Sequence, residues 1–146
     1  MEYALLLILH VLGASIFVGG YLIAAFGVLP TAKKAGNVEI ILNYLNNIKM
    51  LTHIGLLIQF LTGFRLSMTY LPISEWFKFS SPASINIFMK LLLYVLVVVW
   101  MIVGRKRGAL DAQTTDMGKI SSHVMVMTLL IFGLFLFGMN FRTGLL

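Results

Sequence analysis

Four long apolar runs alternate with three short polar segments along this chain. The apolar runs cover about residues 3–29, 50–71, 83–103 and 120–141. Each is close to the roughly 20 residues that an α-helix needs to cross the hydrocarbon core of a bilayer. The pattern predicts an all-α protein in which a single domain, residues 1–146, contains four membrane-spanning helices.

Proline and polar residues mark where the first two spans are expected to end. Pro30 follows the first run and Pro72 follows the second, and proline usually ends a helix nearby. Between them, residues 40–50 alternate apolar and polar side chains at helical spacing, which favours an amphipathic lead-in to the second span. The first run has no basic leader and no clear cleavage site, so we expect a retained span rather than a signal peptide.

Composition supports a membrane setting. The chain is 60% hydrophobic and only 11% charged, whereas about a quarter of the residues in a soluble domain are charged. The absence of cysteine excludes disulfides, thiolate metal sites and iron–sulfur clusters. The net charge of +6 does not indicate nucleic-acid binding, because no soluble basic surface is present to carry it.

The basic residues are concentrated in the first and third polar segments. Those segments and their flanks hold Lys33, Lys34, Lys49, Arg105, Lys106, Arg107 and Lys119. The second segment offers only Lys78. The positive-inside rule therefore places the first and third segments in the cytoplasm and both termini outside it, as in a bacterial inner-membrane protein. Short connections predict an integral membrane antiparallel four-helix bundle, with any site between facing helices.

Three histidines lie within or at the ends of different apolar runs, at His10, His53 and His123. An ionisable side chain inside a bilayer is costly without a partner, so such residues are functional candidates. Imidazole is also a common ligand of haem iron and of other metals. Each histidine taken alone could equally form a hydrogen bond across helices.

A rise of 1.5 Å per residue converts sequence position into depth. His10, Arg65, Lys90 and Asn140 then share the outer half of the bilayer, and Arg142 closes the fourth span on that side. A buried cation needs an anion, and the predicted spans contain no Asp or Glu. Either the cations reach the interface by snorkelling, or a ligand supplies the anion through porphyrin propionates, a quinone-like oxygen or a lipid headgroup.

The same depth estimate places His53 and His123 together in the inner half of the bilayer. Two histidines at matched depth on different helices could be the axial ligands of a second haem. They could equally be interfacial residues that reach headgroups or water. Thr52 and Ser122 directly precede them, and either hydroxyl could support the second ring nitrogen or cap a helix.

Nine methionines keep copper as an alternative cofactor. Met125 and Met127 follow His123, and thioether with imidazole is a soft ligand set for Cu(I). Residues two apart point to different faces of a helix, however, and two fixed cations beside His10 would repel a bare cuprous ion. The chain has no phosphate-binding loop, nucleophile elbow or paired carboxylates, so enzyme activity would depend on a bound cofactor.

Several short segments resemble the membrane domain of the copper-resistance D family. They are LHVLGASIFVGGYL followed by LP, IGLLIQFLTGFRLS followed by LP and WF, MKLLLYVL, and a terminal FRTG. The likeness extends in order over nearly the whole chain. Two departures, Tyr21 where that pattern often has a second histidine and Phe17 where it has tryptophan, weaken a copper site on the first helix.

The chain is also more distantly similar to the HemJ-type, oxygen-independent protoporphyrinogen oxidases, which are small four-helix proteins. In that group an early histidine and a lysine in a KLLL-type third helix are thought to serve haem or porphyrin chemistry. The resemblance implies such a role for His10 and Lys90.

These observations predict a membrane protein that binds one or two haem b groups and transfers electrons or performs porphyrin redox chemistry. The expected ligands are His10, His53 and His123, and the expected cofactor-binding residues also include Arg65, Lys90 and Asn140. Copper transport or resistance is the first alternative, and an accessory subunit of a respiratory complex is the second. A quinone, a redox partner protein and a homodimer are partners that the sequence leaves open.

Overall fold

The computed structural model describes the backbone of residues 1–110 and 116–143, with side chains through Met139. Within these residues every regular element is helical, which confirms the predicted all-α class. The elements in chain order are α1 (Glu2–Ile23), the π-helix η1 (Ala24–Val28), α2 (Leu29–Ala35), α3 (Val38–Tyr70), the 3-10 helix η2 (Ile73–Glu75), α4 (Pro82–Lys106) and α5 (Met117–Thr143).

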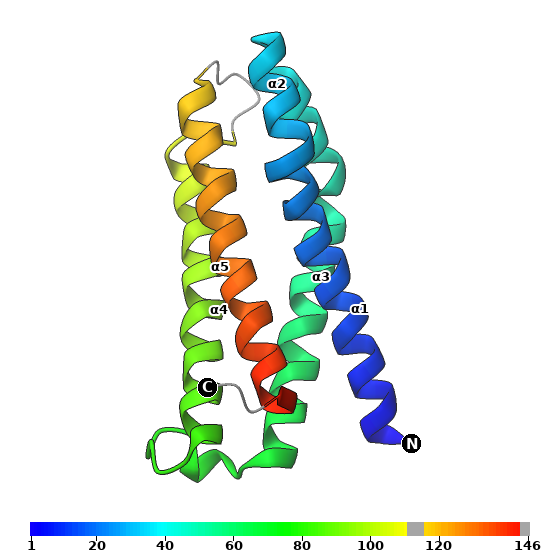
Figure 1. The fold of residues 1–146 in the computed structure, drawn as a ribbon, viewed down its shortest axis with the longest axis vertical. Helices are drawn as coiled ribbons and strands as arrows, with labels where there is room; N and C mark the ends of the chain where they lie inside the picture. Colours follow the sequence, from blue (N-terminus) through cyan, green and yellow to red (C-terminus); the bar gives the residue numbers. More distant parts are fainter. Residues whose placement is uncertain (111–115, 144–146) are drawn as a thin grey trace.

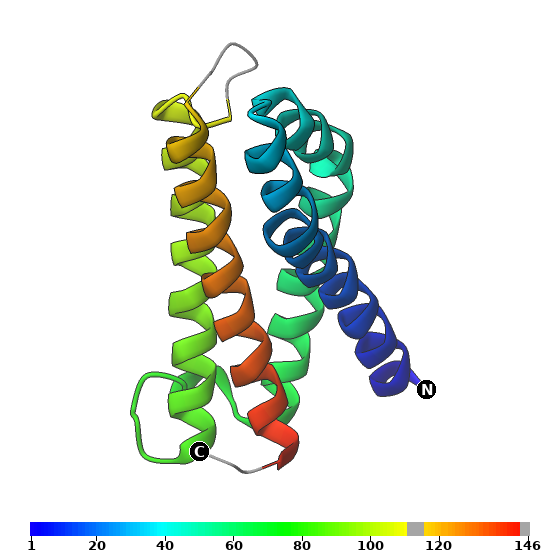
Figure 2. The same cartoon turned by 45° about the horizontal axis from the view of Figure 1, so that its top comes forward.

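Long helices lie side by side and alternate in direction (Figures 1 and 2). α1 packs along α3, α4 packs along α5, and α1 also contacts α5. The start of α1 and the end of α5 lie at one end of the molecule, which we call the terminal end (Figure 1). α2 and the end of α4 lie at the opposite end, which we call the basic end.

The first helical segment continues past Pro30, where the sequence pattern led us to expect its end. It is helical from Glu2 to Ala35, with the π-helix η1 directly before α2. A proline ring clashes with the carbonyl four residues earlier in a regular α-helix, and the wider π turn around Phe26 relieves that crowding. Tyr44 supports this region from α3, because its hydroxyl donates to the Gly20 carbonyl at 2.9 Å.

A tight connection joins α2 to α3. Gly36 adopts a left-handed conformation with φ of 62°, which glycine tolerates without a steric penalty. The Asn37 N–H donates to the Ala32 carbonyl at 3.1 Å, and the Asn37 side chain caps α3 by accepting from the Glu39 N–H at 2.9 Å. The segment expected as an amphipathic lead-in is therefore the first part of α3.

Three helical segments are long and apolar enough to cross a membrane: Glu2–Ala35, Pro82–Lys106 and Met117–Met139. In the most apolar stretches of the first two, only 17% of the residues are buried, so their apolar side chains mainly face outwards. Such a surface is suited to lipid. α3 has 33 residues, about 50 Å at 1.5 Å per residue, but His53, Gln59 and Arg65 make it more polar.

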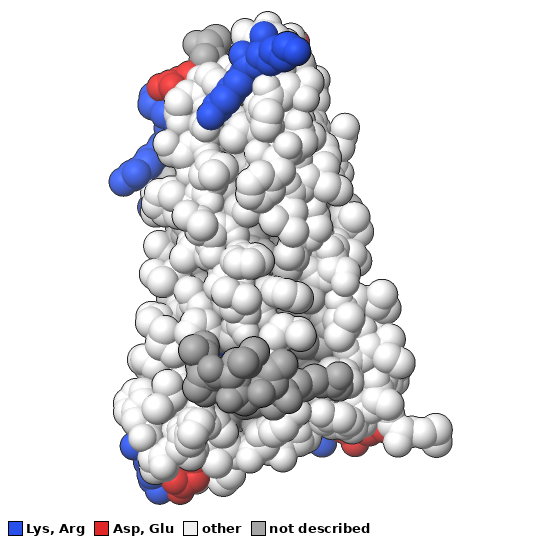
Figure 3. All heavy atoms as spheres, in the orientation of Figure 1, with Lys and Arg blue, Asp and Glu red and all other residues white. Residues whose placement is uncertain are grey.

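Charged side chains are distributed unequally between the two ends (Figure 3). At the terminal end, two surface cations each contact a carboxylate: Arg65 contacts Glu2 at 2.9 Å, and Lys78 contacts Glu75 at 2.6 Å. The helix ends at the basic end carry Lys33, Lys34, Arg105, Lys106, Arg107 and Lys119. The positive-inside rule predicts the orientation from such an excess of Lys and Arg at one end of the helices.

The tightly packed core occupies the basic half and the middle of the molecule. One buried cluster includes Leu29, Ile41 and Ile120, and a second includes Val97 and Met127. The terminal half is packed less completely, and the space between its helices forms a cavity.

Candidate functional site

A cavity of about 500 Å³ lies between α1, α3, α4 and α5 in the terminal half. We call it the His10 cavity. Its size falls in the range of small-molecule and cofactor sites, which are mostly apolar with a few polar groups. Aromatic lining comes from Phe17, Phe60, Phe64, Trp76, Tyr94 and Phe135, among others. Its lining includes two ionisable nitrogen-bearing side chains, His10 and Lys90, and no described carboxylate.

The His10 ring is held in one orientation by Thr62. His10 Nδ1 lies 2.8 Å from Thr62 Oγ1, and that hydroxyl donates its proton to the Ile58 carbonyl at 2.5 Å. Because a hydroxyl has a single proton, Thr62 must accept the hydrogen bond from His10 Nδ1–H. The neutral ring then carries its free lone pair on Nε2, which makes no hydrogen bond within the described chain. This tautomer is the one in which Nε2 can bind a metal ion or accept a proton.

Small and polar residues of α3 position α1 so that His10 reaches the cavity. The Gln59 side chain donates to the His10 carbonyl. A Cβ atom at Gly63 would lie 3.0 Å from His10 Cε1, so glycine lets the ring lie against α3. Further along, a Cβ at Gly13 would lie 3.1 Å from the Gly55 carbonyl oxygen. The glycines thus allow close approach of α1 and α3.

Lys90 reaches the same cavity from α4. Its side chain is partly buried, and its Nζ would lie 3.8 Å from a Cβ placed at Gly138 on α5. Of the residues predicted to form an outer site, the structure thus brings His10 and Lys90 together around one space.

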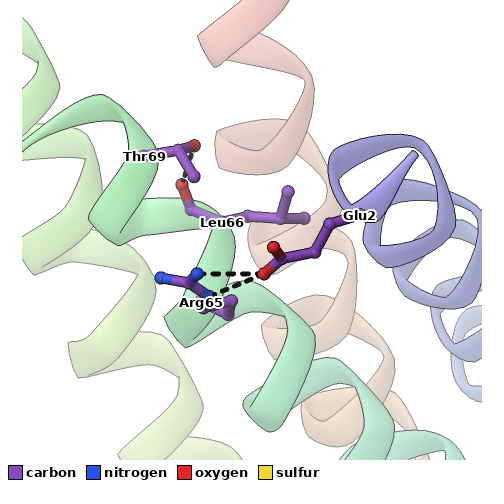
Figure 4. Close-up of polar contacts among 4 residues, drawn as sticks. All are labelled: Glu2, Arg65, Leu66 and Thr69. Carbon is purple, nitrogen blue, oxygen red and sulfur yellow. Dashed lines mark hydrogen bonds and ion pairs between the residues drawn. The ribbon is translucent and has the colours of Figure 1, made fainter.

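Arg65 is placed elsewhere, and its geometry corrects the reasoning from sequence. Glu2 accepts hydrogen bonds from Arg65 Nε at 3.2 Å and from Nη2 at 2.9 Å (Figure 4). The two side chains are 53% and 71% exposed, and Arg65 does not line the His10 cavity. The anion that pairs with Arg65 is therefore the Glu2 carboxylate of the same chain, and Glu2 lies just before the predicted first span.

The inner pair of histidines is not brought into one cavity. His53 is exposed; its Nδ1 donates to the Lys49 carbonyl at 2.6 Å, and its Nε2 lies 3.3 Å from Arg105 Nη2, which is a donor. The Thr52 hydroxyl also donates to the Lys49 carbonyl, at 2.9 Å, so it does not support the His53 ring. Both His53 nitrogens are thus engaged.

His123 is buried and lines a different, smaller cavity of about 370 Å³ near the basic end. We call it the His123 cavity. Ser122 also lines it. Met125 is 40% exposed while Met127 is fully buried in the core, as expected for residues on different faces of a helix. Asn140 and Arg142 lie outside the residues whose side chains the structure describes.

No group of three or more His, Cys, Asp or Glu side chains within the described chain is arranged to hold a metal ion. A cofactor that takes one or two protein ligands is compatible with the His10 cavity, whereas a metal held by a full set of such side chains is not.

Sequence reasoning missed Thr62 and Gln59. The available signal was their spacing: they lie three residues apart on an otherwise apolar helix, so they share one face. Polar residues on such a face are expected to meet a neighbouring helix, where they can hydrogen-bond.

Comparison with protein-family models, with curated proteins and with solved structures found no match. The function of this chain therefore has to be inferred from its own residues and cavities.

Proposed function

We propose that the protein is a four-span membrane helix bundle that binds one haem b in the His10 cavity and serves electron transfer or porphyrin redox chemistry. His10 Nε2 would bind the haem iron, and Lys90 would neutralise a carboxylate of the porphyrin. The observation that carries this proposal is the hydrogen bond from His10 Nδ1 to Thr62, which leaves Nε2 as the acceptor in an apolar cavity.

The Thr62 contact has the form expected beside a metal-binding histidine. Such histidines almost always donate their other ring N–H to a neighbouring oxygen, which fixes the tautomer and raises ligand basicity. A purely structural histidine could make the same contact, but it would have no need of a free Nε2 beside a cavity of about 500 Å³.

The remaining lining suits a flat, conjugated and anionic ligand. Aromatic side chains stack well against such a molecule, and Lys90 adds a positive charge where no described carboxylate lines the cavity. Haem supplies the one-electron chemistry when bound, while the protein supplies ligation, exclusion of water and charge. A bare copper ion has less support, because Lys90 would repel it.

The test is an optical spectrum of the full-length protein purified from haem-replete cells, oxidised and then reduced. We expect a Soret band in the wild type and its loss in His10→Ala. His53→Ala is the matched control, because His53 is exposed and does not line the cavity, and it should keep the band. A colourless wild type, or equal loss in both variants, would overturn the proposal.

Elemental analysis of the same preparations separates the alternatives. Stoichiometric copper that disappears in His10→Ala, without a Soret band, would replace haem binding with copper transport or resistance. A preparation without any cofactor that co-purifies with larger proteins would instead indicate an accessory subunit of a respiratory complex.

Four spans require α3 to cross the membrane with α1, α4 and α5, so that both termini lie on the same side. The basic residues at the opposite end support a proposed orientation with both termini outside the cytoplasm of a bacterial cell. Because the chain has no cysteine, single cysteines can be introduced directly at the exposed positions Asn43 and Ser74. In intact spheroplasts, an impermeant thiol reagent should label Ser74→Cys and spare Asn43→Cys. Labelling of both positions, or of neither, would show that α3 does not cross.

A further inference from the structure

His123 is the one residue of the described chain with buried side-chain polar atoms that lack any hydrogen-bond partner. It is 2% exposed, and neither Nδ1 nor Nε2 has a partner. Buried polar atoms are nearly always satisfied in folded proteins, and an exception indicates an absent water, ion or ligand.

The surroundings hold the His123 ring in place without satisfying its nitrogens. The ring stacks on Trp100, with centroids 6.1 Å apart and an interplanar angle of 9°. The Trp100 indole donates instead to the His123 carbonyl, at 3.2 Å. A Cβ at Gly104 would collide with His123 Cε1 and Nδ1. Glycine at this position therefore makes the space that the ring occupies.

The His123 cavity carries more positive than negative charge. Arg107 and Lys119 line it from the end of α4 and the start of α5, and Asp116 is the described carboxylate among the lining residues. Asp116 is engaged locally: it accepts from the Lys119 N–H at 3.1 Å and lies 3.6 Å from Lys119 Nζ. Arg107 is exposed and forms no ion pair with another described residue.

The charge and volume of the cavity point to an anion rather than to a metal or a single water molecule. Two lysine or arginine side chains repel a cation. A water molecule occupies about 30 Å³, whereas this cavity has about 370 Å³. Arginine and lysine are common ligands of phosphate.

We propose that the His123 cavity binds a phosphate group, either of an anionic phospholipid headgroup or of free phosphate. One His123 ring N–H donates to a phosphate oxygen, and Arg107 and Lys119 pair with its charge. His123 lies six residues after the start of α5, about 9 Å along the helix, a depth close to the headgroup region in the orientation proposed above. Basic pockets between helices on the cytoplasmic side are suited to anionic lipids.

Trp100 supplies a direct reporter, because it stacks on His123. The chain has two tryptophans, so Trp76→Phe leaves Trp100 as the only one. Full-length protein of this background, in neutral detergent micelles, is titrated with short-chain phosphatidylglycerol, with short-chain phosphatidylcholine and with inorganic phosphate, while Trp100 fluorescence is followed.

We expect a saturable response to phosphatidylglycerol that is weakened about tenfold in Arg107→Gln, as the loss of one charge-assisted hydrogen bond predicts. His123→Phe keeps a stacking ring but removes both nitrogens, and it should weaken binding several-fold. The matched control is Lys106→Gln, which removes one positive charge at the same end from a residue that does not line the cavity; it should change the affinity less than about twofold. Circular dichroism confirms that each variant keeps its helices.

The titrations distinguish the two sources of phosphate. A response to inorganic phosphate with the same dependence on His123 and Arg107 supports the site and assigns it to a free anion, while a response to phosphatidylglycerol alone assigns it to a lipid. The proposal is overturned by an equal response to phosphatidylcholine, by no response at all, or by equal weakening in Lys106→Gln and Arg107→Gln. Each titration follows the change in Trp100 fluorescence within one preparation of constant haem content, so this proposal and the proposed function fail independently.

Discussion

Two buried or half-buried histidines of this protein have opposite surroundings. His10 donates to Thr62 and presents Nε2 beside a large cavity with aromatic lining. The His123 ring stacks on Trp100, and its two nitrogens have no hydrogen-bond partner among the described residues. It lines a smaller cavity near the basic end, with more charged residues in its lining. Under the two proposals above, the same side chain in similar apolar helices would bind different partners. A free lone pair beside an apolar space suits a metal-centred cofactor, whereas an unsatisfied donor in a cavity that is also lined by two cations suits an anion.

A glycine on the neighbouring helix makes room for each histidine ring, but the two glycine positions differ in how well they would tolerate a side chain. A Cβ at Gly63 would lie 3.0 Å from the His10 ring, whereas a Cβ at Gly104 would overlap the His123 ring. A small shift of the His10 ring would therefore make room for a Cβ at Gly63, whereas the His123 ring, which stacks on Trp100, would have to leave its position. This difference between the two histidine sites can be tested by substituting residues around His10 and around His123 separately.

The largest effect is expected from removing the acceptor of His10. Thr62→Val keeps the shape of the side chain and deletes the hydroxyl, so His10 loses the contact that orients its ring and selects its tautomer. Loss of such a supporting group typically weakens metal binding about 10- to 100-fold. Haem titration followed at the Soret band measures the change, and Thr62→Ser, which restores a hydroxyl, should bind nearly as well as the wild type. Equal haem affinity of Thr62→Val and the wild type would show that the hydrogen bond from His10 to Thr62 does not prepare His10 to bind haem.

The next effect compares the two glycines. Gly104→Ala places a Cβ where the His123 ring now lies and forces the ring off its stacked position on Trp100. We expect it to destabilise the protein by about 1–3 kcal/mol, the usual cost of overpacking. Gly63→Ala should cost less, because His10 can shift toward its cavity. Gly19→Ala is the control: nothing lies within 4 Å of its Cβ position, so it should be neutral or slightly stabilising. Unfolding in mixed micelles measures all three, and an order with Gly63→Ala most damaging would contradict the description of the two sites.

A smaller effect should separate Lys90 from Arg65, two of the cations of the terminal half. Lys90→Gln removes positive charge from the His10 cavity and is expected to weaken haem binding by less than about tenfold. Arg65→Gln breaks the exposed contact with Glu2 instead, so haem affinity should stay the same and stability should fall by less than about 1 kcal/mol. If Arg65→Gln weakened haem binding as much as Lys90→Gln, the two cations would not have the separate roles inferred here.

The smallest effect concerns Asp116 at the His123 cavity. A hydrogen bond from the Lys119 N–H lowers the pKa of its carboxyl group below the ordinary value of 3.8, so the group is ionised at neutral pH and opposes a bound anion. Asp116→Asn keeps a helix-capping residue and should raise phosphate affinity by about two- to fivefold at neutral pH. The difference from the wild type should vanish as the pH falls below the lowered pKa, because the wild-type carboxyl group is then also neutral. Tryptophan fluorescence measures both, and weaker binding in Asp116→Asn would reverse the inferred charge balance.

Much of the architecture could be predicted from the sequence because hydropathy and charge are distributed along the chain itself. The four apolar runs correspond to four long helical segments, and three of these are apolar enough to cross a membrane. The helix boundaries were less predictable. Pro30 lies inside a helical segment because a π turn precedes it, and proline patterns alone do not distinguish a break from such an adjustment.

The candidate sites were only partly predictable. The shared depth of His10 and Lys90 follows from a constant rise per residue, and the two residues do line one cavity. Depth along a helix does not specify which way a side chain points around the helix axis. The depth estimate therefore also grouped Arg65 with His10 and Lys90, and it paired His53 with His123. In the structure Arg65 meets Glu2 on an exposed face, and His53 faces Arg105.

By itself, the sequence determined that the protein is helical, that its long apolar segments suit a membrane, and that its basic residues are concentrated at one end. These are properties of single segments, and each can be read without knowing which helices are neighbours. Only the tertiary structure decided that Thr62 orients His10 and that Glu2 supplies the carboxylate for Arg65. It also decided that the His123 ring nitrogens have no partner among the described residues and that His123 shares a cavity with two cations. The physical reason is that a hydrogen bond or an ion pair requires two atoms to come within about 3 Å, and side chains on different helices meet that condition only through the packing and rotation of those helices.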